Sequence, residues 1–113
     1  MSVAAAAKPK AAVAFPAADI EACLREELLE ALRDEAGLRG LPVPSSAAAA
    51  ASMMIEMDSL VVVDLLCAVE PVLGFELREG LVRAGGYGSV DEAVAHLMPR
   101  IEREWTRRKG GKS

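Results

Sequence analysis

The stretch that decides the fold is DSLVVVDLLCAVEPVLG, residues 58–74. Its apolar run continues from Leu60 to Ala68 without a turn signal, so a helix is favoured, although Val61–Val63 alone would also suit a strand. Asp58 and Ser59 are good capping residues at its start. We predict a helix from Ser59 to about Leu73, loosening or ending between Pro71 and Gly74. Its predicted buried stripe is Leu60, Val63, Leu66 or Cys67, and Val69.

Upstream, a second periodic run predicts a helix from Asp19 to Ala36. Its apolar residues recur every four positions, at Ile20, Leu24, Leu28 and Leu32. Asp19 is the expected N-cap and Gly37 the expected C-cap residue. The connection from residue 38 to 57 is long and begins with Pro42 and Pro44, so it is predicted to be a functional or a packed loop. Its apolar end, residues 53–57, should fold back onto the core, and residues 47–51 suit a turn of helix.

Downstream, residues 75–77 predict a short extended link and residues 78–84 one or two helical turns with Leu81 and Val82 inward. The glycines in residues 85–88 should stop these turns. Ser89 and Glu92 then form a capping-box pattern in front of a final helix. Pro99 should either end this helix at Met98 or begin a second, basic segment. The pattern as a whole predicts an all-α fold, a four-helix bundle with a long loop between the first two helices.

Charge is distributed unevenly along the 113 residues, whose net charge is -4. Residues 19–99 hold five arginines against fifteen acidic residues, a net charge of -10. Residues 1–18 are alanine-rich with Lys8 and Lys10, and residues 100–113 hold six basic residues against two acids. We therefore predict a disordered leader over 1–18, one domain over 19–98, and a basic C-terminal extension over 99–113 that is partly helical or disordered.

Several classes of protein are disfavoured by composition. No uncharged stretch is long enough to span a membrane, and aromatic residues are only 4%, so the core should be aliphatic. Cys23, Cys67 and the single His96 offer neither a disulfide framework nor a zinc site, and they fit a reducing, cytosolic setting. The acidic body argues against a nucleic-acid partner, despite Arg100, Arg103 and the other basic residues of the tail. No catalytic residue is expected, and the protein is expected to be a monomer.

Ser59 is the residue whose position suggests chemistry. A hydroxyl at a helix N-terminus is exposed, and a phosphate ester there would face free backbone N–H groups and the positive end of the helix dipole. The position therefore suits a serine that is modified to carry a phosphodiester. A serine hydrolase is a poor fit, because only His96 is present and the Gly-x-Ser-x-Gly pattern is missing. The alternative interpretation is that Asp58 and Ser59 only cap a helix.

Taken together, Asp58-Ser59-Leu60 at the start of an aliphatic helix, behind a long loop and an N-terminal helix, resembles the acyl carrier protein family. The resemblance covers about residues 19–98 and includes Phe75-Glu76-Leu77 and the start of the last helix at residues 89–93. It implies that Ser59 receives 4'-phosphopantetheine from coenzyme A and carries an acyl group as a thioester. It also implies recognition by a phosphopantetheinyl transferase and by acyl-transferring or acyl-activating enzymes, through Asp58, Leu60, Val61, Asp64 and Glu70.

The chain departs from that family in ways that suggest a specialised carrier. Glu56 stands where the family usually has glycine, and the helix after Ser59 retains only Asp64 and Glu70 as acids. Valines at 61, 62 and 72 occupy positions that are often polar, which predicts a more apolar docking surface. A dedicated aminoacyl carrier and an unmodified, carrier-like interaction module both stay open as alternatives.

Overall fold

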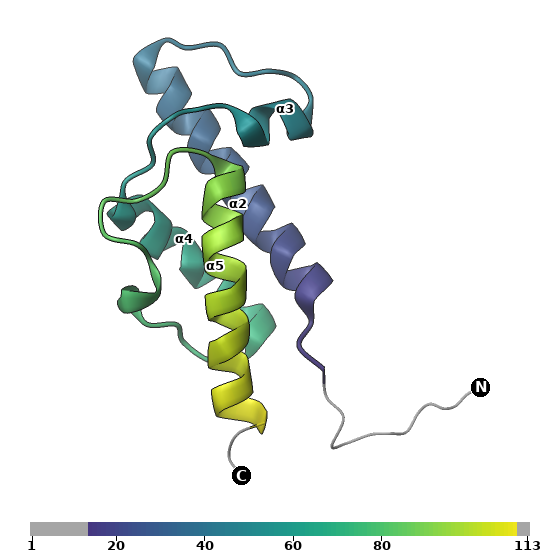
Figure 1. Cartoon of the computed structure of the whole chain (residues 1–113). Helices are drawn as coiled ribbons and strands as arrows, with labels where there is room; N and C mark the ends of the chain where they lie inside the picture. The colour runs from purple at the N-terminus through teal and green to yellow at the C-terminus, as the bar shows by residue number, and fades with distance from the viewer. Residues whose placement is uncertain (1–13, 111–113) are drawn as a thin grey trace, which may run out of the picture.

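The computed structural model describes residues 14–110, with only the backbone of residues 109 and 110. Within this range the chain is an all-α bundle of four α-helices (Figure 1). They are α2 (Ala17–Arg39), α3 (Ala47–Ser52), α4 (Ser59–Leu73) and α5 (Val90–Trp105). A 3₁₀ turn, η2 (Glu79–Leu81), precedes α5, and a π-helical turn, η3 (Thr106–Gly110), follows it. No helix in this part of the chain is long and apolar enough to cross a membrane.

Helix α2 is longer at both ends than its sequence predicts. It begins at Ala17, so the predicted boundary between leader and domain falls inside the helix. It also passes through Gly37 and ends at Gly40, which has a φ of 68°. The N–H of Gly40 donates to Gly37 (3.2 Å) and that of Leu41 to Ala36 (2.9 Å), so the helix ends in a Schellman motif. The predicted apolar stripe is confirmed, since Ile20, Leu24, Leu28 and Leu32 are buried completely.

The connection after α2 is packed rather than free. Ser46 caps the short helix α3 by accepting a hydrogen bond from the N–H of Ala49 (3.0 Å), and Ala50 and Ala51 are buried. The following segment buries Ile55 and Met57, as predicted, but leaves Met54 75% exposed. The long loop therefore covers the top of the bundle with two apolar anchors.

Helix α4 has the predicted bounds, and Leu66 and Val69 are buried as predicted, but the first turn of the helix buries a different residue from those expected. Val62 is buried completely and Val63 only half, whereas Leu60 is 78% exposed. Leu65, Leu66, Val69 and Leu73 complete the buried side. The prediction placed Leu60 and Val63 on the buried stripe because three successive valines give no periodicity from which to choose.

Helix α5 does not end at Met98. It passes through Pro99 and continues to Trp105, burying Ile101, Glu104 and Trp105. The Trp105 ring packs edge-on against Phe15, with ring centroids 5.9 Å apart, so the chain before α2 and the end of α5 meet at one end of the bundle. The first part of the predicted C-terminal extension, residues 99–105, thus forms about the last two turns of the bundle's final helix.

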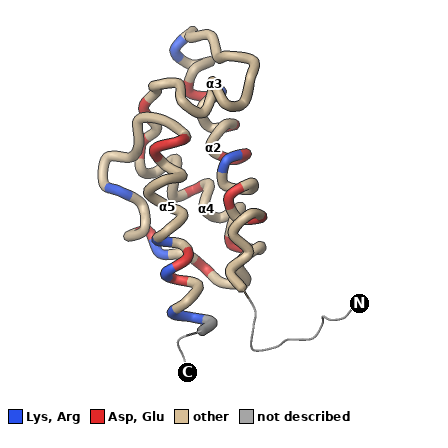
Figure 2. The backbone as a smooth tube through the Cα atoms, turned by 45° about the vertical axis from the view of Figure 1, so that its right-hand side comes forward, with Lys and Arg blue, Asp and Glu red and all other residues tan. Residues whose placement is uncertain are grey.

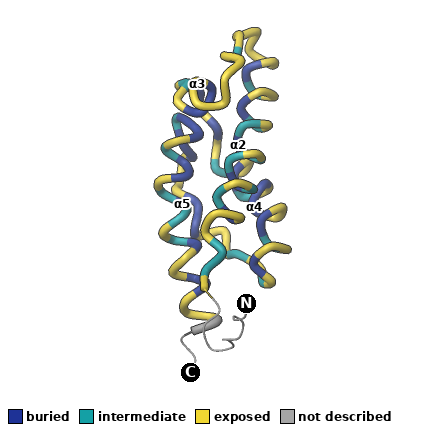
Figure 3. Tube along the Cα trace, turned by 90° about the vertical axis from the view of Figure 1, so that its right-hand side faces the viewer, coloured by how far each residue is buried: buried dark blue, intermediate teal, exposed yellow. Residues whose placement is uncertain are grey.

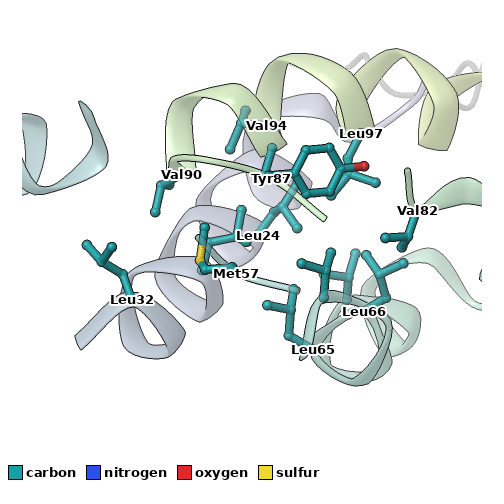
Figure 4. Packing of buried hydrophobic residues seen from close by; sticks show 14 of the residues in the cluster. Leu24, Leu32, Met57, Leu65, Leu66, Val82, Tyr87, Val90, Val94 and Leu97 are labelled. Atoms are coloured by element: carbon teal, nitrogen blue, oxygen red, sulfur yellow. The ribbon is translucent and has the colours of Figure 1, made fainter. Parts of the chain in front are cut away.

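The core lies where α2 faces both α4 and α5 (Figure 3). It is built almost wholly from aliphatic side chains, as the low aromatic content predicts. Figure 4 shows Leu24 and Leu32 from α2, Leu65 and Leu66 from α4, and Leu97 from α5 converging there. Met57, from the connection between α3 and α4, and Tyr87, from the connection between α4 and α5, enter the same core. Burial of Met57 therefore anchors the segment that immediately precedes Ser59.

Candidate functional site

Ser59 is the first residue of α4 and is half-buried. Asp58 is the N-cap, and its Oδ1 accepts a hydrogen bond from the N–H of Val61 at 3.0 Å. Within the described residues, the Ser59 hydroxyl makes no hydrogen bond, and the N–H groups of Ser59 and Leu60 donate none. A phosphate on Ser59 would therefore meet two unengaged donors at the positive end of the helix dipole.

A backbone bridge fixes the segment that leads into Ser59. Met57 and Tyr87 exchange two backbone hydrogen bonds (2.9 and 3.0 Å), and the N–H of Ile55 donates to Gly88 at 2.9 Å. Gly86 makes this approach feasible, because a Cβ on it would lie 2.0 Å from the Met57 carbonyl oxygen. Its φ of 86° also favours glycine. The sequence alone predicts for Gly86 only a role in stopping the preceding turns, because nothing in the sequence reveals which backbone lies against it.

Three of the predicted recognition residues form one exposed surface next to Ser59. Leu60 is 78% exposed, Val61 is 36% exposed, and Asp64 is exposed one turn after Leu60. Leu60 and Val61 are adjacent exposed apolar residues at the start of a helix whose buried face lies elsewhere. Exposed apolar side chains that are grouped beside an unengaged serine hydroxyl suit a docking surface.

Glu70 lies apart from this surface. It is eleven residues after Ser59, about 16 Å along the helix axis at 1.5 Å per residue. Its Oε2 accepts a hydrogen bond from the N–H of Leu77 at 2.8 Å, in a half-buried position. Glu70 thus holds the link after α4 in place, and recognition of partners through it stays a prediction.

His96 is engaged in the fold rather than paired with a serine. Its Nδ1 lies 2.7 Å from the Tyr87 hydroxyl, which also accepts a hydrogen bond from the N–H of Arg83 at 3.0 Å. Burial, followed by the nearby Arg100 and Arg83, lowers the pKa of His96. The neutral imidazole that results suits a hydrogen bond donated by Tyr87. No Ser–His pair of the hydrolase kind is formed within residues 14–110.

The two cysteines do not form a reactive pair. Cys23 donates a weak hydrogen bond to the Ala68 carbonyl (3.6 Å), and burial, then Glu27 and Glu26, raises its pKa. A raised pKa leaves less thiolate, so Cys23 is a poor nucleophile. Cys67 is exposed on α4. No three His, Cys, Asp or Glu side chains among the described residues are arranged to hold a metal ion.

The basic end of the molecule is partly occupied by internal contacts. Figure 2 shows basic residues gathered near the C-terminal end of α5 and acidic residues along α2. Arg78 and Arg107 both donate to the buried carboxylate of Glu104, at 2.7 and 2.8 Å, and the guanidinium of Arg108 lies 4.8 Å from the Phe75 ring centroid. These arginines make internal contacts that hold the end of α5, so fewer cations are left for a phosphate backbone, which argues against a nucleic-acid surface.

Comparison with known proteins identifies no relative. No protein-family model, no curated protein and no solved structure matches the chain. The functional interpretation therefore depends on the residues around Ser59 and on their arrangement.

Proposed function

We propose that this chain is a carrier protein that holds an acyl group as a thioester on a 4'-phosphopantetheine arm attached to Ser59. The observation that carries the proposal is the state of Ser59 at the first position of α4, with its hydroxyl unengaged, Asp58 as the cap, and Leu60 exposed beside it. A phosphodiester on that oxygen would accept hydrogen bonds from free N–H groups, an interaction worth about 0.3–1 kcal/mol at an exposed helix end.

The bundle supplies a rigid base for such an arm and performs no catalysis itself. Met57 exchanges two backbone hydrogen bonds with Tyr87, which hold the backbone that leads into Ser59 in place relative to the segment before α5. Partner enzymes would therefore meet a constant surface made by Asp58, Leu60, Val61 and Asp64. The phosphopantetheinyl transferase would read this surface first and the acyl-handling enzymes afterwards.

Mass spectrometry tests the proposal directly. The full chain is incubated with coenzyme A and a promiscuous phosphopantetheinyl transferase, and we expect a mass gain of one phosphopantetheine group. Ser59→Ala should abolish the gain. Ser52→Ala is the matched control, because the Ser52 hydroxyl is exposed and only donates to the Ala49 carbonyl (3.1 Å). Modification that persists in Ser59→Ala would end the assignment of this site.

An unmodified interaction module is the second candidate, favoured by the exposure of Leu60 without any arm. The same experiment separates the two candidates, since a module of that kind gains no mass. Whether the cargo is acyl or aminoacyl would follow from the mass of the native modified protein.

A further inference from the structure

A groove runs between α2 and α4 on the side of Val61. It has a volume of about 670 Å³. Its apolar lining comes from both helices: Ala31 and Leu38 from α2, and Val61, Leu65 and Ala68 from α4. Leu38 is 84% exposed, so a large apolar side chain stands open at one end of the groove. Such a lining offers anchoring positions for apolar side chains of another molecule.

Carboxylates border this apolar lining. They are Glu27, Glu30, Asp34 and Glu35 from α2 and Asp64 from α4. Only Glu35 has an ion-pair partner within the described residues, Arg39 at 3.0 Å. Among the residues that the structure describes, no Lys or Arg lines the groove. Figure 2 shows acidic residues spaced along α2, the helix that carries four of these five carboxylates.

We propose that this groove docks a cationic amphipathic helix of a partner protein. The partner's apolar side chains would lie between α2 and α4, and its Lys and Arg residues would pair with the free carboxylates. From Glu27 to Leu38 the groove follows twelve residues of α2, a rise of about 16 Å, which is the length of three helical turns. The anchors of the partner should therefore recur at i, i+4 and i+7.

The negative charge of the groove favours a cationic partner helix over a second copy of the chain, a nucleic acid or an anionic membrane. A second copy of the chain meeting the same face would oppose like charges, and a nucleic acid or an anionic membrane would be repelled in the same way. The groove also begins at Val61, two residues from Ser59, so a docked helix would lie beside the attachment point of the arm. Only the identification of the partner as an enzyme that uses the arm rests on the proposed function.

The test uses the full chain, labelled with ¹⁵N, and a synthetic amidated 12-residue helix of leucine and lysine with its leucines on one face. A peptide of the same composition in scrambled order is the control for amphipathicity. We expect NMR shift changes concentrated in residues 27–38 and 61–68, and binding by the scrambled peptide that is at least tenfold weaker. Equal binding of the two peptides, or shift changes centred on another face, would overturn the inference.

Two pairs of variants separate the groove from net charge. Glu30→Lys with Asp34→Lys should weaken peptide binding about tenfold, because two attractive pairs become repulsive. Glu26→Lys with Glu102→Lys changes the net charge equally on exposed residues outside the groove, and it should change affinity less than twofold. Equal losses in both double variants would show general electrostatic attraction and overturn the proposal.

A second pair of variants, which changes no charge, tests the apolar lining and controls for a general effect on folding. Leu38→Ser should weaken binding severalfold, whereas Val72→Ser, on an exposed valine outside the groove, should not. Self-association of the wild-type chain that Glu30→Lys with Asp34→Lys abolishes would assign the groove to a second copy and overturn the proposal. Loading of Ser59 is measured separately on each variant. Absent peptide docking to a wild-type chain that loads normally refutes only this inference, whereas absent loading of the wild type refutes only the carrier function.

Discussion

Two helices of this bundle contain a proline, and they differ in how far they continue beyond it. Helix α4 ends at Leu73, two residues after Pro71, whereas α5 continues for six residues after Pro99. Each proline destabilises its helix in the same way, because it lacks an N–H donor and its ring clashes with the carbonyl four residues earlier. Cys67 and Ala95, which lose that N–H partner, are both exposed, so solvent lies close to each of them.

The difference comes from what each helix buries after its proline. Beyond Pro99 the chain buries Ile101 and Trp105, each worth about 1.5–3 kcal/mol, which together exceed the cost of about 3 kcal/mol for an interior proline. Beyond Pro71 it buries only Leu73, and Gly74 then takes the left-handed conformation with a φ of 90°. A proline therefore ends a helix here only where little apolar surface follows it.

The largest effect on stability should come from removing Trp105, a large buried residue of α5 beyond Pro99. Trp105→Ala deletes a buried ring and its contact with Phe15, so we expect a loss of about 3 kcal/mol in the free energy of unfolding. Urea denaturation measures the loss, and NMR should show the turn after Pro99 frayed. Arg103→Ala, at an exposed position in the same turn, is the control and should cost less than about 0.5 kcal/mol. Equal stability of the two variants would show that Trp105 does not hold this end.

The next largest effect concerns Glu104, which fastens the same turn. Hydrogen bonds from Arg107 and then Arg78 lower its pKa against the opposing effect of burial. Because the folded pKa is depressed, the contribution is present above the unfolded value of about 4.3 and is lost as pH falls through the folded pKa. Glu104→Gln should cost about 1–3 kcal/mol at neutral pH.

The pH dependence of unfolding distinguishes that contribution from simple packing. As pH falls from about 4.3 through the lower folded pKa, the variant and the wild type should converge in stability, because Glu104 then becomes protonated in the folded state as well. Glu92, whose pKa is lowered by Arg83, titrates in the same direction, so Glu104→Gln should flatten only part of the acid transition. A difference between the two proteins that stays constant from pH 7 to pH 3 would contradict a role for the charge.

A smaller effect tests where the leader ends. Residues 1–18 are predicted from the sequence to be a disordered leader, but Phe15 packs on Trp105 and the Pro16 carbonyl accepts a hydrogen bond from the N–H of Ile20 (3.0 Å). Deleting residues 1–16 should therefore cost about 1 kcal/mol, the value of one aromatic pair, or about 5 °C in Tm. Deleting residues 1–13, which lie outside the described residues, should leave Tm unchanged. The reverse order of effects would refute the structural role of Phe15.

The helix ends show which parts of the fold can be predicted from the sequence. Asp58 and Gly74 mark both ends of α4 with local signals, and the predicted bounds agree with the structure. Gly37 was a wrong C-cap, because the signal that decides is the proline two residues after Gly40, not the first glycine met. The part of α5 after Pro99 packs Trp105 against Phe15, which is ninety residues earlier in the chain, and no local pattern encodes such a contact.

In the candidate site, too, the features that depend on adjacent residues were predictable, and those that depend on distant packing were not. Ser59, Asp58 and the helix start were readable from three adjacent residues, since capping is local chemistry. The contact of Gly86 with Met57 and the groove beside Val61 depend on how distant helices pack, so sequence patterns did not reveal them. The engagement of Glu70 with Leu77 was hidden for the same reason.

The smallest effect on stability should come from the part of α4 that lies before its proline and faces outward. Val61→Asp places a carboxylate at a position that is 36% exposed and in the first turn of the helix, where a negative charge is favourable. We expect a change in the free energy of unfolding below about 1 kcal/mol. If the surface beside Ser59 docks partners, the rate of phosphopantetheine loading should fall about fivefold, as for loss of one apolar interface contact. Val72→Asp, on the same helix but beyond Pro71 and 42% exposed, is the matched control and should load at the wild-type rate. A large loss of stability in Val61→Asp would make Val61 a packing residue, and unchanged stability with unchanged loading would remove it from both roles.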